Sequence, residues 1–518
     1  MKKAFILLLG LVPSLLFAQL YNDQVFVVSG GVFEFSPPFA DYVRIHRYHP
    51  ITRTLEPVDQ IGSQSTQGAL IAEDTLYVLT SDSIVAYQTQ TGQRLAATRF
   101  PGASPSPGSI AHAPNGRLLV GNWYGQTDSN LYFFNTGNLT LTQAVTGMTR
   151  QTRGIAIWQD TAYVAQNIPG TIDECPPFGC YSDSIGQLAM ININTGLKFD
   201  ELTFSATEGG MDQLFMQNGI LYTINNTGES ISRFQTADRT IASWTIPGDV
   251  GRGIVLQDSL LHLEVNGQAA IWNTQSQTLM SSALSVFAYP AAIGYDPGAQ
   301  LYYETTTDFS SYGRLYQTQS VILDSVETGI APEAIALHYR MNYPPVAQDD
   351  SVQIIYTQDT IVNVLANDAD ETLKTFAVRI IDSFDVVGSQ AFVDSQQSIH
   401  LFPAAGIETT DTLRYEVCDG LGGCDTARLT LKTTGFDGIP LTTADRLLVY
   451  PNPFQDKIYI LSSVAIDRWR LFHSNGQLIQ EGSENPGMIT VTESASGLYI
   501  LQIDNPKGRQ YSKLSRIH

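Results

Sequence analysis

The chain has 518 residues, which is long enough for about three domains. Hydrophobic residues make up 43% of it and charged residues only 15%, a composition typical of folded β-rich extracellular proteins, and one that excludes a disordered chain. The net charge is −21, and a near-neutral C-terminal segment from Leu447 leaves −22 on residues 1–446. Such an acidic body repels nucleic acid and anionic membranes, so neither is predicted as a partner.

The N-terminus has the pattern of an export signal. Two lysines, Lys2 and Lys3, precede a short apolar run, and Ala18 is a small residue at the cleavage point. The sequence therefore predicts a cleaved signal peptide over residues 1–18. The run is too short to span a bilayer stably, and no later stretch of about 20 apolar residues follows, so no transmembrane segment is predicted after cleavage.

Residues 21–339 repeat at a period of near 40 residues, each unit opening with an apolar strand that three more strands follow. The units open near residues 68, 109, 154, 212, 253 and 291. A seventh opening strand, residues 333–337, has no followers, whereas strands at residues 25–28, 43–48 and 52–55 lack an opening strand. The two ends can therefore complete one blade together, which removes an exposed edge. This predicts a seven-bladed β-propeller over residues 19–341; eight blades stay possible if the N-terminal region hides another.

Two strands of this region resemble a known repeat. Tyr222-Thr223-Ile224-Asn225 is similar to the Tyr-Val-Thr-Asn strand of YVTN-type, surface-layer-like propellers, and residues 163–167 match it with one extra residue before Asn167. The resemblance implies a propeller but only a broad function.

Pro344-Pro345 then marks a boundary. Residues 361–370 and 413–420 contain Leu-Ala-Asn-Asp and Tyr-x-Val-x-Asp phrases that resemble bacterial cadherin-like or Ig-like modules, which implies a β-sandwich over residues 342–436.

The C-terminal segment, residues 445–518, reads as a second, smaller β-sandwich. Its strands and turns resemble the type A C-terminal sorting domain of the type IX secretion system of Bacteroidetes-type bacteria. The residues that carry this resemblance are Pro451, Asn452, Pro453, Gly497, Tyr499 and Lys513. The resemblance implies export through the periplasm to the outer cell surface or the medium, with the type IX machinery as a partner.

The four cysteines form two close pairs, Cys175 with Cys180 and Cys418 with Cys424. In an exported chain close pairs predict local disulfides. A zinc site would also use four cysteines, but these pairs fall in different predicted domains.

In a four-stranded propeller, the loops that enter the innermost strands and those between the second and third strands share one face, over the central channel. We call this the channel face. The candidate ligand-binding residues there are Gln67, Trp123, Tyr124, Arg153, Asp212, Arg252, Tyr289 and Glu333. Aromatic and guanidinium groups suit an anionic or sugar-like ligand. The alternative is a ring of polar residues that satisfies backbone groups around a water-filled channel.

No nucleophile motif, zinc motif or phosphate loop occurs, so a binding or adhesion protein for a polysaccharide or other cell-surface ligand is favoured. A lyase- or lactonase-like propeller enzyme and a structural surface protein remain the alternatives. No cofactor is predicted, apart from a calcium hypothesis at Asp349, Asp368 and Asp370, where turn formation is the simpler explanation.

Overall fold

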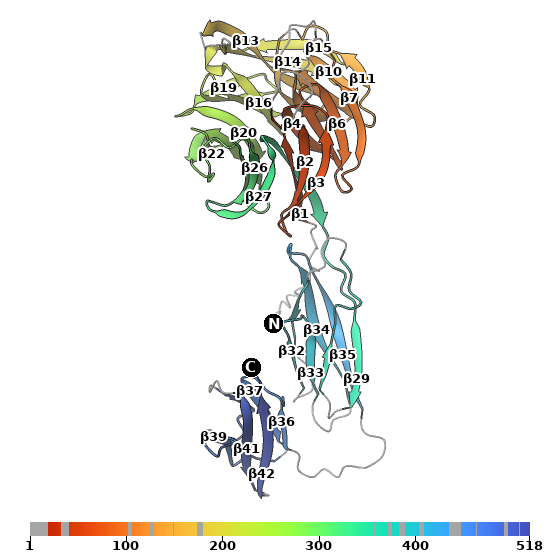
Figure 1. The fold of residues 1–518 in the computed structure, drawn as a ribbon, viewed down its shortest axis with the longest axis vertical. Coiled ribbons are helices and arrows are strands. Elements are labelled where there is room, and N and C mark those ends of the chain that lie inside the picture. The colour runs from red at the N-terminus through yellow and green to blue at the C-terminus, as the bar shows by residue number, and fades with distance from the viewer. Residues whose placement is uncertain are drawn as a thin grey trace, which may run out of the picture. The chain divides into compact units, whose positions relative to one another are not determined.

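A computed structural model describes residues 19–32, 41–101, 106–123, 129–148, 150–173, 180–355, 359–370, 376–382, 389–403, 409–434, 447–462, 464–491, 496–506 and 508–517. The predicted signal peptide, Tyr124 and Cys175 lie outside these residues. Leu20–Met341 form one compact unit, and the chain from Asn342 onward belongs to a second. Apart from one 3₁₀ turn, η1 (Ala206–Glu208), the regular elements of the described residues are β-strands (Figure 1).

The described residues of the first unit contain seven four-stranded sheets, the blades of a β-propeller. Blades are numbered here along the chain, and the strands of each are given from the innermost outward. Blade 1 is β28 (Pro332–Asn342), β1 (Gln19–Ser29), β2 (Val43–His49) and β3 (Thr54–Ile61). Blade 2 is β4 (Thr66–Ala72), β5 (Thr75–Thr80), β6 (Ser83–Gln88) and β7 (Arg94–Arg99). Blade 3 is β8 (Pro107–Ala113), β9 (Arg117–Asn122), β10 (Leu131–Asn135) and β11 (Leu141–Ala144).

The remaining blades keep the same order. Blade 4 is β12 (Thr152–Trp158), β13 (Thr161–Asp173), β14 (Cys180–Asn192) and β15 (Leu197–Thr203). Blade 5 is β16 (Met211–Gln217), β17 (Ile220–Asn225), β18 (Ser230–Gln235) and β19 (Ile241–Thr245). Blade 6 is β20 (Val250–Gln257), β21 (Leu260–Val265), β22 (Gln268–Asn273) and β23 (Thr278–Ser281). Blade 7 is β24 (Ile293–Asp296), β25 (Leu301–Thr306), β26 (Tyr312–Thr318) and β27 (Ile322–Ile330).

The core lies between blades, because the second and third strands are apolar on both sides. Leu76 and Val78 of β5 and Val85 and Tyr87 of β6 are almost completely buried, and they pack with Phe26 of blade 1 in one cluster. Such two-sided burial explains why these strands read as continuous apolar runs rather than alternating ones.

Blade 4 is extended by a β-ribbon. Strands β13 and β14 stay paired beyond the blade, from Asn167–Gly186 out to Asp173–Cys180. The pairing shifts register at Ile168 and Pro169, which is how the ribbon accommodates a proline that has no N–H group to donate.

The second unit contains two sandwiches. The Ig-like one has a four-stranded sheet and a three-stranded sheet. In sheet order these are β29 (Asp350–Ile355), β35 (Cys424–Thr434), β34 (Thr409–Asp419) and β31 (Phe376–Ile380); and β30 (Thr360–Val362), β33 (Ile399–Phe402) and β32 (Gln390–Val393). Its core centres on Tyr415, Leu413 and Leu429, which are fully buried.

The C-terminal sandwich pairs a three-stranded sheet with a four-stranded sheet around Phe454, Tyr499 and Leu501. In sheet order these are β36 (Leu447–Tyr450), β37 (Lys457–Ser462) and β40 (Met488–Thr490); and β39 (Leu478–Ser483), β38 (Arg468–His473), β41 (Gly497–Asn505) and β42 (Gly508–Arg516).

Blade 1 closes the ring as the sequence predicts: β28, from the end of the propeller, is the innermost strand beside β1 from its beginning. A buried histidine reinforces this closure. The Nδ1 of His338 lies 2.6 Å from Oδ1 of Asp23 on β1, and its Nε2 lies 3.3 Å from Oγ1 of Thr89 and 3.4 Å from Oδ1 of Asp74. Since Asp74 and Thr89 belong to blade 2, one side chain connects the closing strands to the next blade.

We expect His338→Ala to lower the free energy of unfolding of the propeller by about 2–4 kcal/mol, because it removes a buried hydrogen-bonding group and leaves Asp23 without it. Calorimetry of the full chain would record this as a lower melting temperature. Arg340→Ala is the control, because its guanidinium is partly exposed and 3.9 Å from Asp23; its effect should stay within about 0.5 kcal/mol. Equal effects of the two substitutions would contradict the assigned role of His338.

Candidate functional site

The innermost strands carry a β-bulge at the channel face in five blades, and the extra residues include four of the eight predicted ligand residues. In blade 2, Thr66 pairs with Thr80 and Gly68 with Leu79, which leaves Gln67 as the extra residue. The extra position falls at Gly108 in blade 3, Arg153–Gly154 in blade 4, Asp212 in blade 5 and Gly251–Arg252 in blade 6. Because a bulge redirects a side chain, the structure brings these residues to matching positions around the channel.

Trp123 and Arg153 form a pair across blades 3 and 4. The guanidinium carbon of Arg153 lies 4.3 Å from the centroid of the Trp123 ring, a cation–π geometry. The ring occupies the space that a side chain at Gly108 would need, since a Cβ there would be 2.6 Å from Cγ of Trp123. The backbone N–H of Trp123 donates to the Ser106 carbonyl at 2.7 Å. The missing side chain of blade 3 therefore makes room for this pair.

Arg252 holds a loop in place. Its Nε donates to Oε2 of Glu264 at 2.8 Å, and its Nη1 and Nη2 donate to the carbonyls of Ala291 and Pro290 at 2.9 and 2.5 Å. These bonds connect blade 6 to the loop that enters blade 7, so Arg252 supports the site from within the protein. Burial raises the pKa of Glu333, and the charge of Arg252 opposes that shift.

That loop, residues 282–292, presents Tyr289 to solvent. Glu304, which is fully buried, accepts the backbone N–H groups of Val286 and Phe287 at 3.1 and 3.0 Å. The N–H of Tyr289 donates to the Gly267 carbonyl at 2.6 Å, and the tyrosine ring lies over Gly267, where a Cβ would be 2.5 Å from Cδ1. Tyr289 is 70% exposed and has a φ of 55°, which is rare for a bulky residue.

Two further exposed aromatic residues, Phe309 and Tyr312, lie on the channel face of blade 7. Phe309 is 60% exposed, has a φ of 63° and is in the loop between β25 and β26, and Tyr312, 55% exposed, begins β26. Oδ1 of Asp308 accepts the N–H groups of Ser310 and Ser311 at 2.9 and 2.7 Å, bonds that lower the pKa of Asp308 and fix the turn. Sequence reasoning missed both aromatic residues, although an aromatic pair within an Asp- and Ser-rich turn was the available signal.

Tyr289, Phe309 and Tyr312 are named here the blade 7 aromatic group. In the described part of the propeller, the exposed large apolar side chains in the loops and strand ends of the channel face are these three. Tyr289 and Phe309 are also the aromatic residues with a positive φ among all described residues.

Part of the face has the structural role that the polar-ring alternative describes. Each of blades 2 to 7 buries a polar residue near the channel-face end of its second strand: Thr80, Asn122, Gln166, Asn225, Glu264 and Glu304. Oδ1 of Asn122, for example, accepts the Ser106 N–H at 2.9 Å. A polar residue at the end of an apolar strand is the signal in the sequence that marks each of these positions.

Two further predicted ligand residues, Gln67 and Asp212, occupy the bulges of blades 2 and 5. Gln67 donates to Oγ of Ser65 at 2.8 Å, and Asp212 is half-buried at its bulge.

In the Ig-like domain, Asp349 and Asp368 accept backbone N–H groups of Arg428 and Gln348 at 2.8 and 2.7 Å. Burial raises the pKa of Asp368. The carboxylates of Asp349, Asp368 and Asp370 do not gather into a three-ligand group in the described structure, so calcium there stays a prediction.

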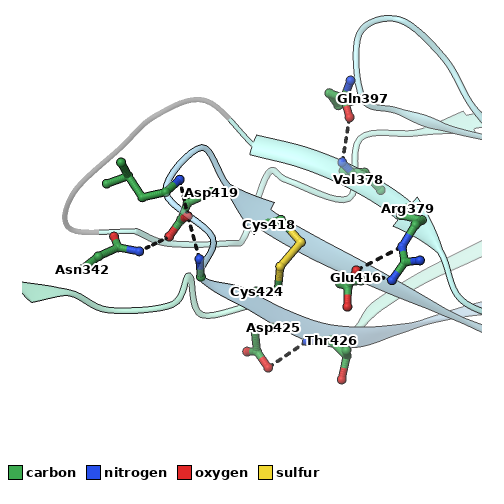
Figure 2. Close-up of a disulfide and its surroundings, with 12 residues drawn as sticks. Asn342, Val378, Arg379, Gln397, Glu416, Cys418, Asp419, Cys424, Asp425 and Thr426 are labelled. Carbon is green, nitrogen blue, oxygen red and sulfur yellow. Dashed lines mark hydrogen bonds and ion pairs between the residues drawn. A yellow bond between two sulfur atoms is a disulfide. The ribbon is translucent and has the colours of Figure 1, made fainter. Parts of the chain in front are cut away.

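The disulfide Cys418–Cys424 is present at the tip of the β34–β35 hairpin (Figure 2). It encloses a turn in which Oδ1 of Asp419 accepts the N–H groups of Leu421 and Gly423 at 2.7 and 2.9 Å. Oδ2 of Asp419 accepts a hydrogen bond from Nδ2 of Asn342 at 2.8 Å. Glu416 lies near both sulfur atoms, but disulfide sulfurs are not thiolate ligands, so this group is no metal site. The Cys175–Cys180 pair stays a prediction.

The C-terminal sandwich connects its first loop to its last strand. The side chain of Asn452 donates to the Lys513 carbonyl at 3.0 Å and accepts the Ser515 N–H at 2.8 Å. Tyr499 is fully buried, with its ring edge-to-face to Phe454 at 5.6 Å. The side chain of Lys513 is exposed, so the backbone of this residue makes the contact.

Comparisons with known families agree with this architecture. Residues 342–432 match the bacterial Ig domain, and residues 448–516 match the secretion system C-terminal sorting domain. No curated protein matches the chain. No helix among the described residues is long and apolar enough to cross a membrane.

Similar solved structures include two provisionally assigned 6-phosphogluconolactonases. The one from Bacteroides uniformis is 14% identical with a TM-score of 0.44, and the match covers 61% of this chain and 100% of that one. The one from Bacteroides fragilis is 13% identical with a TM-score of 0.42, covering 61% and 98%. The computationally designed protein Ika8 is 10% identical with a TM-score of 0.35, covering 52% and 89%.

The chain thus consists of a seven-bladed propeller, a bacterial Ig-like domain and a type IX C-terminal sorting domain. The sorting domain directs it through the periplasm to the cell surface or the extracellular space.

We expect Asn452→Ala to reduce export, because the variant lacks the two side-chain hydrogen bonds from Asn452 to β42. Immunoblots of cell fractions should show protein retained in the periplasm, as with deletion of residues 447–518. Gln480→Ala, on the exposed side of β39, is the matched control and should be exported normally. Normal export of the Asn452 variant would show that this connection is dispensable for sorting.

Proposed function

We propose that this exported protein is a binding protein, and that it holds a carbohydrate on the channel face over blade 7. The observation that carries the proposal is the blade 7 aromatic group, in which Tyr289 and Phe309 are exposed at loop tips with left-handed backbones. The type IX sorting domain supports the location of this activity outside the cell.

The backbone geometry argues for function because it opposes stability. A strained residue costs about 1–3 kcal/mol, and such residues persist where the surrounding structure fixes them, often at ligand sites. An exposed aromatic ring offsets none of that cost by burial. Two such residues at adjacent loop tips are therefore difficult to explain by folding alone.

The surroundings of Tyr289 favour a preformed site. Bonds from Glu304, Arg252 and Gly267 fix the loop before any ligand arrives, so little conformational entropy is lost on binding. Flat, rigid rings with polar edges suit the apolar C–H face of a sugar ring, while loop carbonyls and hydroxyl groups can bond to its hydroxyl groups. Glu264 and Glu304, the buried carboxylates nearby, are engaged in holding loops.

We expect Tyr289→Ala and Phe309→Ala each to weaken carbohydrate binding by about tenfold or more, since truncating a central aromatic contact commonly has that effect. The measurement is binding of the mature full-length protein to a glycan array, followed by calorimetric titration of the best polysaccharide.

Phe199→Ala provides the control, because Phe199 is 58% exposed on β15, the outermost strand of blade 4, away from the channel. Its binding should equal that of the unmodified protein. If the two blade 7 variants bound as tightly as the Phe199 variant, the assignment of the site to blade 7 would be wrong.

A further inference from the structure

A second group of residues on the channel face, at the seam of blades 3 and 4, indicates which carbohydrates fit. We propose that the ligand is an acidic polysaccharide chain that crosses the channel mouth, with its sugar rings on the blade 7 aromatic group and its acidic groups at Arg150 and Arg153. This inference rests on the proposed function and specifies its ligand.

Arg150 provides the first observation. It lies between β11 and β12, in the segment that enters the innermost strand of blade 4. Its carbonyl accepts Nε2 of Gln166 at 3.1 Å, whereas its Nη1 is buried and has no hydrogen-bond partner in the described structure. The Arg150 side chain as a whole is only half-buried, so a carboxylate or sulfate at the channel face can reach its accessible part, and the added negative charge would offset the cost of the buried, unpartnered nitrogen.

Arg153 provides the second observation. It lies three residues further along, with its guanidinium over the Trp123 ring. Stacking on the Trp123 ring fixes the plane of the guanidinium, whose N–H groups point outward within that plane. A planar, fixed guanidinium group favours carboxylates and sulfates as hydrogen-bond acceptors. Thr152, between the two arginines, is fully buried and donates to the Asn122 and Asn130 carbonyls at 3.2 and 2.9 Å, so the seam is rigid.

The overall charge makes this local arrangement informative. Residues 1–446 carry a net charge of −22, so the body as a whole repels an anionic chain. Two arginines within four residues on the channel face therefore provide local charges of the opposite sign. Short-range contacts of this kind can select an anion even where the long-range field opposes it, because salt screens that field beyond about 8–10 Å.

The spacing of the two groups indicates a polymer. Arg150 and Arg153 lie at the seam of blades 3 and 4, and Tyr289 lies in the loop between blades 6 and 7, three blades further around a ring of seven. Packed sheets are about 10 Å apart, so seven blades have a circumference of about 70 Å at mid-radius and the two groups are about 20 Å apart. A single sugar cannot contact both, whereas a chain of several units can.

The test uses matched polymers on the mature full-length protein. Polygalacturonate and alginate are each compared with their carboxyl-reduced, neutral forms, and each acidic polymer with its monosaccharide, by calorimetric titration at two salt concentrations. At least one acidic polymer should bind at least tenfold more tightly than both its neutral form and its monosaccharide, and binding should weaken as salt is raised.

Variants then separate the two parts of the site. Arg150→Gln with Arg153→Gln should reduce binding of the acidic polymer at least tenfold and leave its neutral form unaffected, with Lys at both positions restoring part of the affinity. Arg239→Gln, an exposed ion-paired arginine outside the channel face, should change neither. Melting curves of each variant show whether the fold is intact.

Equal binding of acidic and neutral polymers, no binding of either acidic polymer, or full affinity in the double Gln variant would overturn this inference. The proposed function would survive those results if a neutral glycan still bound and Tyr289→Ala still abolished its binding. If Tyr289→Ala also left binding of the neutral glycan unchanged, both this inference and the proposed function would be overturned.

Discussion

The pairing of β28 with β1 is the constraint on which the rest of the propeller depends. An open ring would leave an unpaired innermost strand and would expose the cores between blades. The innermost strand of blade 1 is β28, the last strand of the propeller, and not β1, the first. This arrangement fixes the directions in which the chain enters and leaves the propeller. Since β28 begins at the channel face and runs away from it, and β1 runs toward it, both ends leave the propeller at the opposite face. In the described propeller, the channel face is built from internal loops and strand ends.

Within that frame, strands provide rigidity and loops provide variation. The bulges of blades 2 to 6 place one position of each blade at the same level. Asn122, Gln166 and Glu304, buried at the ends of second strands, hold the entering loops. Blade 7 shows the result most clearly, since Glu304 and Arg252 fix a loop that could not hold a strained, exposed tyrosine by itself. Function in such folds commonly lies in loops that a rigid scaffold positions.

Much of the architecture could be predicted from the sequence because it depends on periodic apolar patterns and on turn residues. The seven-bladed count, the closure by residues 333–337 and the Cys418–Cys424 bridge are confirmed. The pairing of Trp123 with Arg153 is consistent with their prediction on one face. What could not be predicted depends on register and backbone angle.

Arg252 illustrates the role of register. As a candidate ligand residue it had no visible partner, because Glu264 comes opposite it only through the bulge in β20. Phe309 illustrates backbone angle, since no composition rule assigns a positive φ to phenylalanine. Strands β13 and β14 illustrate register again, since proline commonly ends a strand, yet register shifts at Pro169 let their pairing continue.

The closing strand also sets an order in time. Synthesis and export proceed from the N-terminus, so β1 emerges near the start of the propeller and its partner β28 only at the end. Until then blades 2 to 7 can each form from local sequence, while blade 1 waits with one edge of β1 unpaired. This strand contains the apolar run Val25-Phe26-Val27-Val28, a composition prone to pairing with other chains. Throughout the interval between these two strands, the nascent chain therefore carries an unpaired apolar strand edge. The sorting domain, which lies after β28, becomes available only once the ring is able to close.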